Sequence, residues 1–134
     1  MNHTPYSVEY RVYWSDTDAA GIAHFTSILK MVEKAEEDLY RSIGIQSVHT
    51  TLPRIEVHVR YRAPLRWGDL AKIELKLEEA RRRGLRYGFK IYNVSINKLA
   101  AEGYIAVACV KKSEGSIAPT ECPEELFEAW KRYG

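Results

Sequence analysis

A single long amphipathic helix among alternating strands is the pattern that most constrains the fold of this chain. Apolar residues recur at steps of three and four from Phe25 to Ile43, so one apolar stripe runs along the predicted helix. Gly44 follows as a natural C-terminal stop. The opposite face carries charged residues, which are Lys30, Lys34, Glu37, Asp38 and Arg41. Such a helix needs a sheet face against which its stripe is buried.

The remaining segments supply the strands of that sheet. Their alternation or their apolar and aromatic content predicts strands over residues 6–14, 55–61, 71–78, 87–96 and 103–112. A short amphipathic helix is predicted to begin at Pro123. The predicted fold class is therefore α+β, a five-stranded antiparallel sheet wrapped round a long helix, with a short C-terminal helix. The hotdog fold and the cystatin-like cone both have this plan, and the pattern alone does not choose between them.

Length and composition narrow the class of protein further. A chain of 134 residues predicts one domain, residues 1–134. A net charge of +2 offers no general attraction for nucleic acid. Because no stretch resembles an export signal or a membrane span, we expect a cytoplasmic protein without membrane attachment. Cys109 and Cys122 have neither CxxC spacing nor the count of a disulfide framework, so we expect reduced thiols.

The segment between the first strand and the long helix carries the most informative chemistry. It reads WSDTDAAGIAHF and places Asp18 just before the first turn of the helix, where backbone N–H groups lack internal partners. Such donors suit a carbonyl oxygen that is becoming an oxyanion, and Asp18 could attack the acyl carbon or activate water against it. The alternative is that Asp16 and Asp18 only organise a turn or cap the helix.

This loop and its flanks resemble a known family. The string DTDAAGIAHF, the following SILKMVEKAEEDLYRSIGI and the later YRAPLRWGD are similar to the signature of the hotdog-fold acyl-CoA thioesterases of the 4-hydroxybenzoyl-CoA thioesterase family. The resemblance favours the hotdog fold over the cystatin-like cone. It implies hydrolysis of acyl-CoA to a free acid and coenzyme A without a cofactor, by a dimer or tetramer whose active sites lie between subunits.

The resemblance also assigns residues to that reaction. Asp18 matches the family's catalytic carboxylate, which acts as a nucleophile or general base. Gly21 and Ile22 match the place where the backbone approaches the thioester closely, and a side chain at Gly21 is expected to obstruct it. The N–H near Phe25 corresponds to the donor that polarises the thioester carbonyl. Asp16 matches a more variable acid, for which a turn-forming role is expected.

Two further helix residues are candidates with open roles. Some members of the family have a His seven residues after the catalytic Asp, where this chain has Phe25 and the histidine stands one residue earlier, at His24. His24 could orient water or substrate, or it could line the pocket without transferring a proton. Glu33 lies where relatives are often acidic, and it could line the pocket or form a structural hydrogen bond.

A basic turn completes the set of candidates. It resembles the turn that relatives use near the nucleotide end of coenzyme A, and its members are Arg81, Arg82, Arg83 and Arg86, with Lys111 and Lys112 as weaker candidates. The alternative is a solvated hairpin turn. The histidines show no metal-ligand spacing, so no metal is expected.

Three rival functions remain open at this point. A non-catalytic hotdog protein would bind acyl-CoA as a sensor or accessory subunit, and Asp18 would then be replaceable. A hotdog dehydratase would need a well-placed His and acid pair, which this sequence does not clearly provide. A cystatin-like protein-binding module would have no affinity for coenzyme A. The sequence does not reveal the acyl group.

Overall fold

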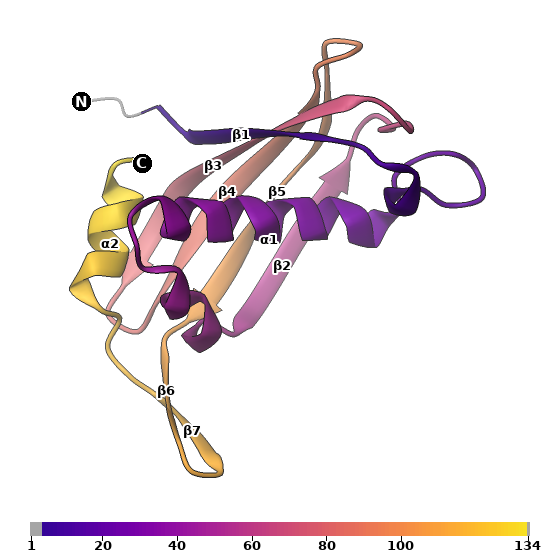
Figure 1. Ribbon diagram of the computed structural model, residues 1–134. Helices are drawn as coiled ribbons and strands as arrows, with labels where there is room; N and C mark the ends of the chain where they lie inside the picture. Colours follow the sequence, from indigo (N-terminus) through magenta and orange to yellow (C-terminus); the bar gives the residue numbers. More distant parts are fainter. Residues whose placement is uncertain (1–3, 134) are drawn as a thin grey trace.

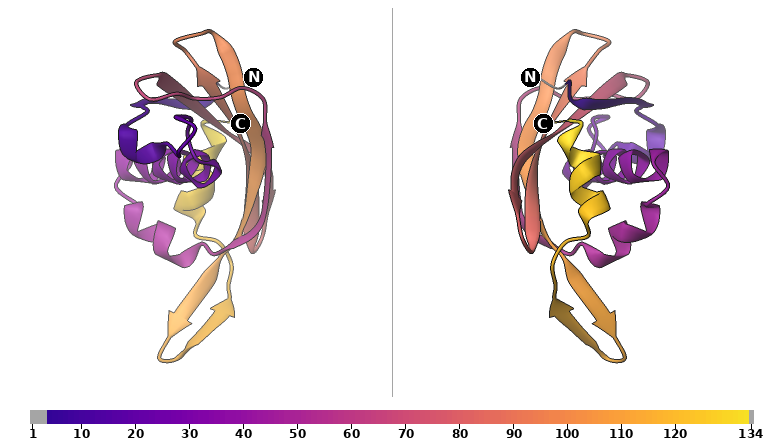
Figure 2. Two further views of the ribbon diagram at one scale, coloured as in Figure 1. Left: turned by 90° about the vertical axis from the view of Figure 1, so that its right-hand side faces the viewer. Right: turned by 90° about the vertical axis from the view of Figure 1, so that its left-hand side faces the viewer.

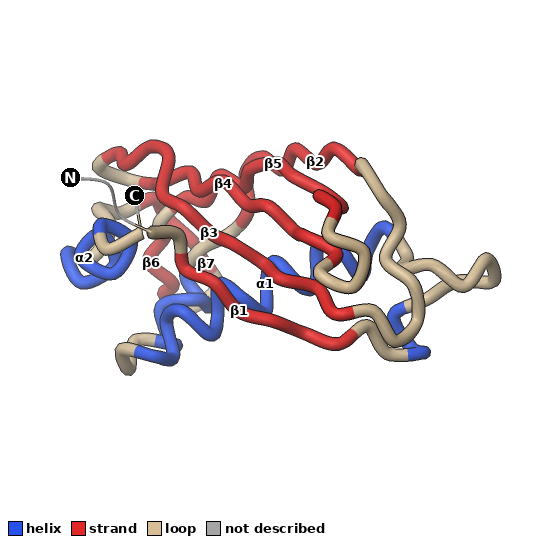
Figure 3. Tube along the Cα trace, turned by 90° about the horizontal axis from the view of Figure 1, so that it is seen from above, coloured by secondary structure: helices blue, strands red, loops and turns tan. Residues whose placement is uncertain are grey.

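The structure is a computed structural model that describes residues 4–133, and its central feature is a five-stranded antiparallel sheet curved round one long helix (Figure 1). Along the chain the elements are β1 (Tyr6–Arg11), η1 (Trp14–Asp16), α1 (Phe25–Ser42), η2 (Gln46–Thr51), β2 (Arg54–Tyr61), β3 (Leu70–Arg81), β4 (Gly84–Asn93), β5 (Lys98–Ala108), β6 (Val110–Ser113), β7 (Ser116–Pro119) and α2 (Glu124–Lys131). The strand order is β1-β3-β4-β5-β2, with β1 at one edge and β2 at the other (Figure 3). The predicted α+β fold class is confirmed.

The apolar stripe of α1 forms one half of the core. Its buried apolar residues are Ile28, Met31, Val32, Ala35 and Leu39, which pack against the inward residues of β3, β4 and β5. Figure 2 shows α1 and α2 on the same side of the sheet. Gly44 has a φ of 78°, which the helix end requires and which glycine adopts without strain. The predicted stripe is confirmed except at Phe25, whose side chain is 60% exposed.

Strand boundaries differ from the predicted ones where two long strands meet. β3 and β4 extend to the turn at Arg82 and Arg83, and β4 ends at Asn93 rather than continuing to Ile96. The predicted last strand over residues 103–112 is also wrong in its bounds, because β5 begins at Lys98 and ends at Ala108. These errors arise because register with a neighbouring strand, rather than local pattern, sets where pairing stops.

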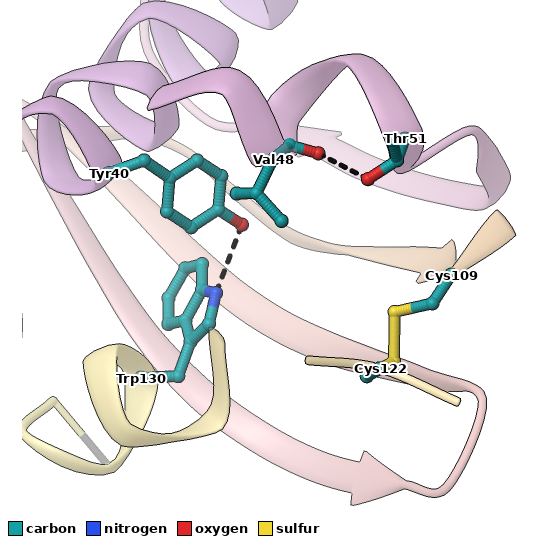
Figure 4. The surroundings of a disulfide bond; sticks show 6 residues. All are labelled: Tyr40, Val48, Thr51, Cys109, Cys122 and Trp130. Atoms are coloured by element: carbon teal, nitrogen blue, oxygen red, sulfur yellow. Dashed lines mark hydrogen bonds between the residues drawn. A yellow bond between two sulfur atoms is a disulfide. The ribbon is translucent and has the colours of Figure 1, made fainter. Parts of the chain in front are cut away.

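The expectation of reduced cysteines is wrong. Cys109 and Cys122 form a disulfide with a Cα–Cα distance of 5.3 Å (Figure 4). The N–H of Cys109 donates to the carbonyl of Arg83, and the N–H of Cys122 donates to the carbonyl of Arg82, at 2.9 Å each. The β3–β4 turn thus holds the two cysteines side by side, which their spacing in the sequence does not reveal. A disulfide that closes a loop of this length typically stabilises a fold by about 3 kcal/mol.

The disulfide closes the base of a hairpin that the sequence did not predict. β6 and β7 pair with each other alone and form a separate two-stranded sheet, residues 110–119, which we call the arm. Gly115, with a φ of 70°, makes its turn. In Figure 2 the arm projects away from the body of the molecule, and nearly all of its residues are exposed.

A buried carboxylate in the core connects α1 with β2 and β4. Glu36 of α1 is fully buried, and its carboxylate accepts hydrogen bonds from the hydroxyls of Tyr40 at 2.8 Å and Tyr87 at 2.7 Å. Arg54 of β2 adds a two-pronged ion pair at 2.5 and 3.2 Å. Burial and the nearby Glu36 charge raise the pKa of both tyrosines well above the ordinary value, so both hydroxyls stay protonated and donate. Trp130 of α2 joins the cluster by donating to the hydroxyl of Tyr40 (Figure 4).

Candidate active site

The loop between β1 and α1 is held to the rest of the fold by backbone hydrogen bonds. Thr17 bridges to Ala23 across the loop, and Ile22 bridges to Arg66 in the β2–β3 connection. The N–H of Ala23 donates to the carbonyl of Leu65 at 2.6 Å. These antiparallel bridges hold residues 17–23 in one conformation at the start of α1.

Asp16 ties this loop to the helix. Its carboxylate accepts the N–H of Tyr13 at 2.8 Å, and its backbone carbonyl accepts both the N–H of His24 and the hydroxyl of Ser27 at 2.9 Å. These contacts fit the turn-forming role expected for Asp16. They use the side chain for local structure and leave the neighbouring acid as the candidate for chemistry.

Asp18 is exposed in the single chain and uses one carboxylate oxygen for its own turn. Oδ1 accepts the N–H of Ala20 at 2.9 Å, while the N–H of Gly21 donates to the Asp18 carbonyl, also at 2.9 Å. Within residues 4–133, no hydrogen bond occupies Oδ2. The turn-organising alternative therefore accounts for one oxygen of Asp18 and leaves the other available.

Gly21 is needed here for its backbone conformation. Its φ of 77° lies in the left-handed region, and a Cβ added to it would meet no atom within 4 Å. Crowding within the single chain therefore does not require glycine. The expectation that a side chain at Gly21 would obstruct the substrate stays a prediction, because it concerns a substrate that would occupy this open space.

The first turn of α1 offers one unpaired donor beside this loop. His24 caps the helix: its ring Nδ1 accepts the N–H of Thr26 at 3.2 Å, and its carbonyl accepts the N–H groups of Ser27 and Ile28. Among the described residues, no acceptor is bonded to the N–H of Phe25. The positive end of the helix dipole adds to that donor, so the Phe25 N–H is placed to receive a negative oxygen.

The ring of His24 has one nitrogen left for a ligand. Nδ1 is occupied by Thr26, whose N–H donates to it at 3.2 Å and whose hydroxyl lies 2.7 Å from it. The ring also stacks on Phe25 with centroids 4.7 Å apart. Nε2 is therefore left to contact a ligand while Nδ1 holds the helix cap.

Tyr61, which the sequence analysis expects among the residues that line the substrate pocket, lies at this junction. Its hydroxyl donates to the backbone carbonyl of Phe25 at 3.2 Å and fastens the end of β2 to the start of α1. Burial raises the pKa of Tyr61, which keeps this donor protonated. The alternation of residues 57–61 puts Tyr61 on the same face as Val57 and Val59.

The four arginines of the basic turn are not all brought together. Arg81, Arg83 and Arg86 line a hollow of about 300 Å³, together with Ile55 and Glu56 at the start of β2. Arg82 turns away and pairs with Glu121, with 2.5 Å between Nε and the carboxylate oxygen. The hollow thus collects three of the four predicted residues.

This hollow and the Asp18 loop lie at opposite ends of β2 within one chain. The hollow includes the start of the strand at Ile55, whereas Tyr61 at its end contacts the start of α1 (Figure 1). Glu33, midway along α1, is exposed and has an ion pair with Arg54 at 3.9 Å, and the structure shows no hydrogen bond for it among the described residues. A single chain therefore does not assemble the whole set of predicted residues.

Across residues 4–133, no helix is both long and apolar enough to cross a membrane. Within the same range, no group of three or more His, Cys, Asp and Glu side chains is placed to hold a metal ion.

Comparisons with known proteins give the family. The acyl-CoA thioester hydrolase YbgC of Escherichia coli O6:H1 is 27% identical over 137 residues, covering 98% of this chain and all of that protein. A 1,4-dihydroxy-2-naphthoyl-CoA thioesterase structure from Synechocystis superposes with a TM-score of 0.83 at 23% identity, covering 94% of this chain and 95% of that one. A mutant 4-hydroxybenzoyl-CoA thioesterase bound to 4-hydroxybenzoyl-CoA also gives 0.83, at 15% identity over 92% and 96% of the two chains.

These structural neighbours decide between the two architectures that the sequence pattern left open, in favour of the hotdog fold. The family model of the thioesterase-like superfamily matches residues 12–130, which include the loop, α1, strands β2 to β5 and most of α2. The chain belongs to the thioesterase-like superfamily.

Proposed function

We propose that this protein hydrolyses acyl-CoA thioesters to a free acid and coenzyme A. The observation that carries the proposal is that two groups at one loop–helix junction have no hydrogen-bond partner among the described residues. They are the Oδ2 of Asp18 and the N–H of Phe25. A carboxylate beside a free helix donor is what attack on a thioester carbonyl requires. Membership of the superfamily and the names of the relatives support the same reaction.

The proposed chemistry needs few groups because a thioester carbonyl is electrophilic. The N–H of Phe25 donates to the carbonyl oxygen as negative charge develops there. Asp18 either attacks the acyl carbon and forms an anhydride that water then hydrolyses, or it takes a proton from the water that attacks. In both routes the C–S bond breaks and coenzyme A leaves as a thiolate, which then takes up a proton. No cofactor takes part, and His24 donates from Nε2 to the substrate or to water.

We further propose a dimer that joins the two β2 edges. β2 pairs only with β5, so its outer edge has unpaired backbone groups, and Ile55 on this strand is 67% exposed. A two-fold axis perpendicular to the sheet pairs one β2 antiparallel to the other. The arginine hollow at the start of one β2 then lies beside the Tyr61 end of its partner, which adjoins the Asp18 loop. Glu33, exposed on α1, is a candidate for lining this joint site.

Release of free thiol from a panel of acyl-CoAs tests the proposed function. We expect turnover of at least one aryl or fatty acyl-CoA, detected as thiol that appears in step with the free acid. Calorimetric binding of a non-hydrolysable acyl-CoA thioether measures affinity separately. Tight binding without thiol release would contradict the proposal and support the acyl-CoA-binding alternative, whereas absence of both would remove acyl-CoA as the ligand.

A second prediction is that the arginines of the hollow bind the phosphates of coenzyme A. Replacing Arg81 and Arg83 by Glu reverses the charge where the phosphates of coenzyme A would lie, so KM for acyl-CoA should rise about tenfold or more. The KM for the matching acyl-pantetheine, which lacks the nucleotide, should change little. Arg82→Glu is the matched control, because Arg82 is turned toward Glu121 and does not line the hollow. Equal effects on both substrates, or an equal effect of the control, would remove the hollow from the proposed site.

A further inference from the structure

The arm is a projecting two-stranded hairpin whose two faces differ in polarity. Cross-strand partners share a face, so the pairing of Lys112 with Ile117 and of Val110 with Pro119 makes one face mainly apolar. Ser116, one residue from Ile117, belongs to the opposite face. Ile117 is 66% exposed in the single chain.

The base of the arm is clamped more firmly than a free hairpin requires. Beyond the disulfide, the N–H of Thr120 donates to the carbonyl of Cys109 at 3.0 Å. Isolated two-stranded hairpins are at best marginally stable in water, and this clamp holds the arm in one direction. The arm therefore presents its apolar face at a defined place.

That place is fixed relative to β2. The N–H of Ala108, just before the arm, donates to the carbonyl of Pro53, just before β2, at 3.1 Å. The arm thus extends from the start of β2, while the Asp18 loop lies beyond the end of β2, where Tyr61 contacts Phe25 (Figure 1). In the proposed antiparallel dimer, the start of one β2 lies opposite the end of the other, so the arm of each protomer reaches the Asp18 end of its partner.

The Asp18 end carries the surface that such an arm would cover. Trp14 is 66% exposed and Trp67 is 63% exposed, and their rings contact each other edge to face with centroids 5.1 Å apart. Tyr13, next to Trp14 in the chain, and Phe25, the first residue of α1, are also exposed. Large exposed aromatic side chains that are gathered in one region mark an interaction surface. The two-fold symmetry of the proposed dimer brings the Ile117 face of one arm to the Trp14–Trp67 surface of the partner, and both are exposed in the single chain.

We infer that the arm of each protomer docks through Ile117 on the Trp14–Trp67 surface of a second copy of this chain and closes the active site of that copy. The inference rests on the proposed function and its β2-edge dimer. The arm acts as a positioning element, because it shields the Asp18 loop from water and fixes the start of α1 without touching the reacting atoms. Each active site is then incomplete without the partner's arm.

A charge placed on one face of the arm tests the docking. Ile117→Glu should lower kcat/KM by about tenfold or more, weaken the dimer in sedimentation, and increase acrylamide quenching of tryptophan fluorescence as Trp14 and Trp67 become accessible. Ser116→Glu is the matched control, since it adds the same charge on the opposite face and should leave all three measurements near those of the wild type. Unchanged quenching and dimer strength in Ile117→Glu, or equal changes in Ser116→Glu, would overturn the inference.

Mixed dimers show whether the arm serves the other protomer. Ile117→Glu mixed with Asp18→Asn forms heterodimers in which one site combines an intact Asp18 with an intact arm. Activity should then rise to about a quarter of the wild-type value, above that of Asp18→Asn, which is nearly inactive, and of Ile117→Glu, which keeps about a tenth or less. If native mass spectrometry shows heterodimers and activity does not recover, the arm acts within its own chain and the inference fails.

The two proposals can fail separately. If the wild-type protein releases no thiol from any acyl-CoA, the proposed function fails, whereas sedimentation and quenching of Ile117→Glu still report whether the arm docks. If thiol release is normal and those two measurements do not change, the arm inference alone fails. A second variant, in which an Asn-Gly turn replaces residues 111–118 between the two retained cysteines, should reproduce the Ile117→Glu result.

Discussion

Replacing Asp18 by Asn is expected to lower kcat for acyl-CoA hydrolysis by about 10²–10⁴-fold. The amide oxygen of Asn can still accept the N–H of Ala20, so the turn that contains Gly21 stays intact. What the substitution removes is the negative charge and basicity of Oδ2. Affinity for a non-hydrolysable acyl-CoA thioether should therefore stay close to that of the wild type while thiol release is lost.

Asp16→Asn is the matched control for this prediction. It makes the same chemical change two residues earlier, and its amide oxygen can still accept the N–H of Tyr13. Because the Asp16 carboxylate is already used to hold the loop, kcat should change by only a few-fold. Thiol release at the wild-type rate in Asp18→Asn, or an equal loss in Asp16→Asn, would show that Asp18 has no special part in the reaction.

Removing the buried carboxylate of Glu36 should have the largest effect on stability. Glu36→Ala leaves the guanidinium of Arg54 and the hydroxyls of Tyr40 and Tyr87 without their shared acceptor. Breaking a buried ion pair by deleting one partner typically costs about 3–5 kcal/mol, and Arg54, which is mostly buried, would keep only the more distant Glu33 at 3.9 Å. Urea unfolding followed by tryptophan fluorescence, in which buried Trp130 serves as the reporter, would measure the loss.

Glu37→Ala provides the comparison on the same helix. Glu37 pairs with Arg41 at 2.7 Å on the solvated face, where both side chains are about half exposed. Surface pairs of this kind contribute little, so the free energy of unfolding should barely change. A loss in Glu36→Ala no larger than that in Glu37→Ala would mean that the buried cluster does not hold α1, β2 and β4 together.

The long helix, the five strands of the main sheet and the C-terminal helix could be predicted because each depends on nearby residues. The stripe of α1 repeats every three or four residues, and Gly44 stops the helix by its own conformational freedom. The strands showed period-two alternation, which is likewise local. The loop motif around Asp18 indicated the family through a run of adjacent residues, and the match over residues 12–130 confirmed that family.

The errors concern residues that are distant in the sequence. The Cys109–Cys122 bond depends on the backbone of the β3–β4 turn, which approaches both cysteines only after β3, β4 and β5 have paired in register. The Glu36–Arg54 pair likewise joins elements 18 residues apart and had no periodic signature. Sequence reasoning instead singled out Glu33, one turn earlier on α1, whose side chain is exposed.

Local pattern was sufficient to give the helix, the five strands and the chemical character of the Asp18 loop, since periodicity and turn preference act over a few residues. It could not show that the arginine hollow and Asp18 occupy opposite ends of β2, or that the arm stands apart from the main sheet. Those facts follow from strand register and packing, which depend on contacts across the whole chain. They place the two halves of the proposed site, and the arm, where a second copy of the chain can join them.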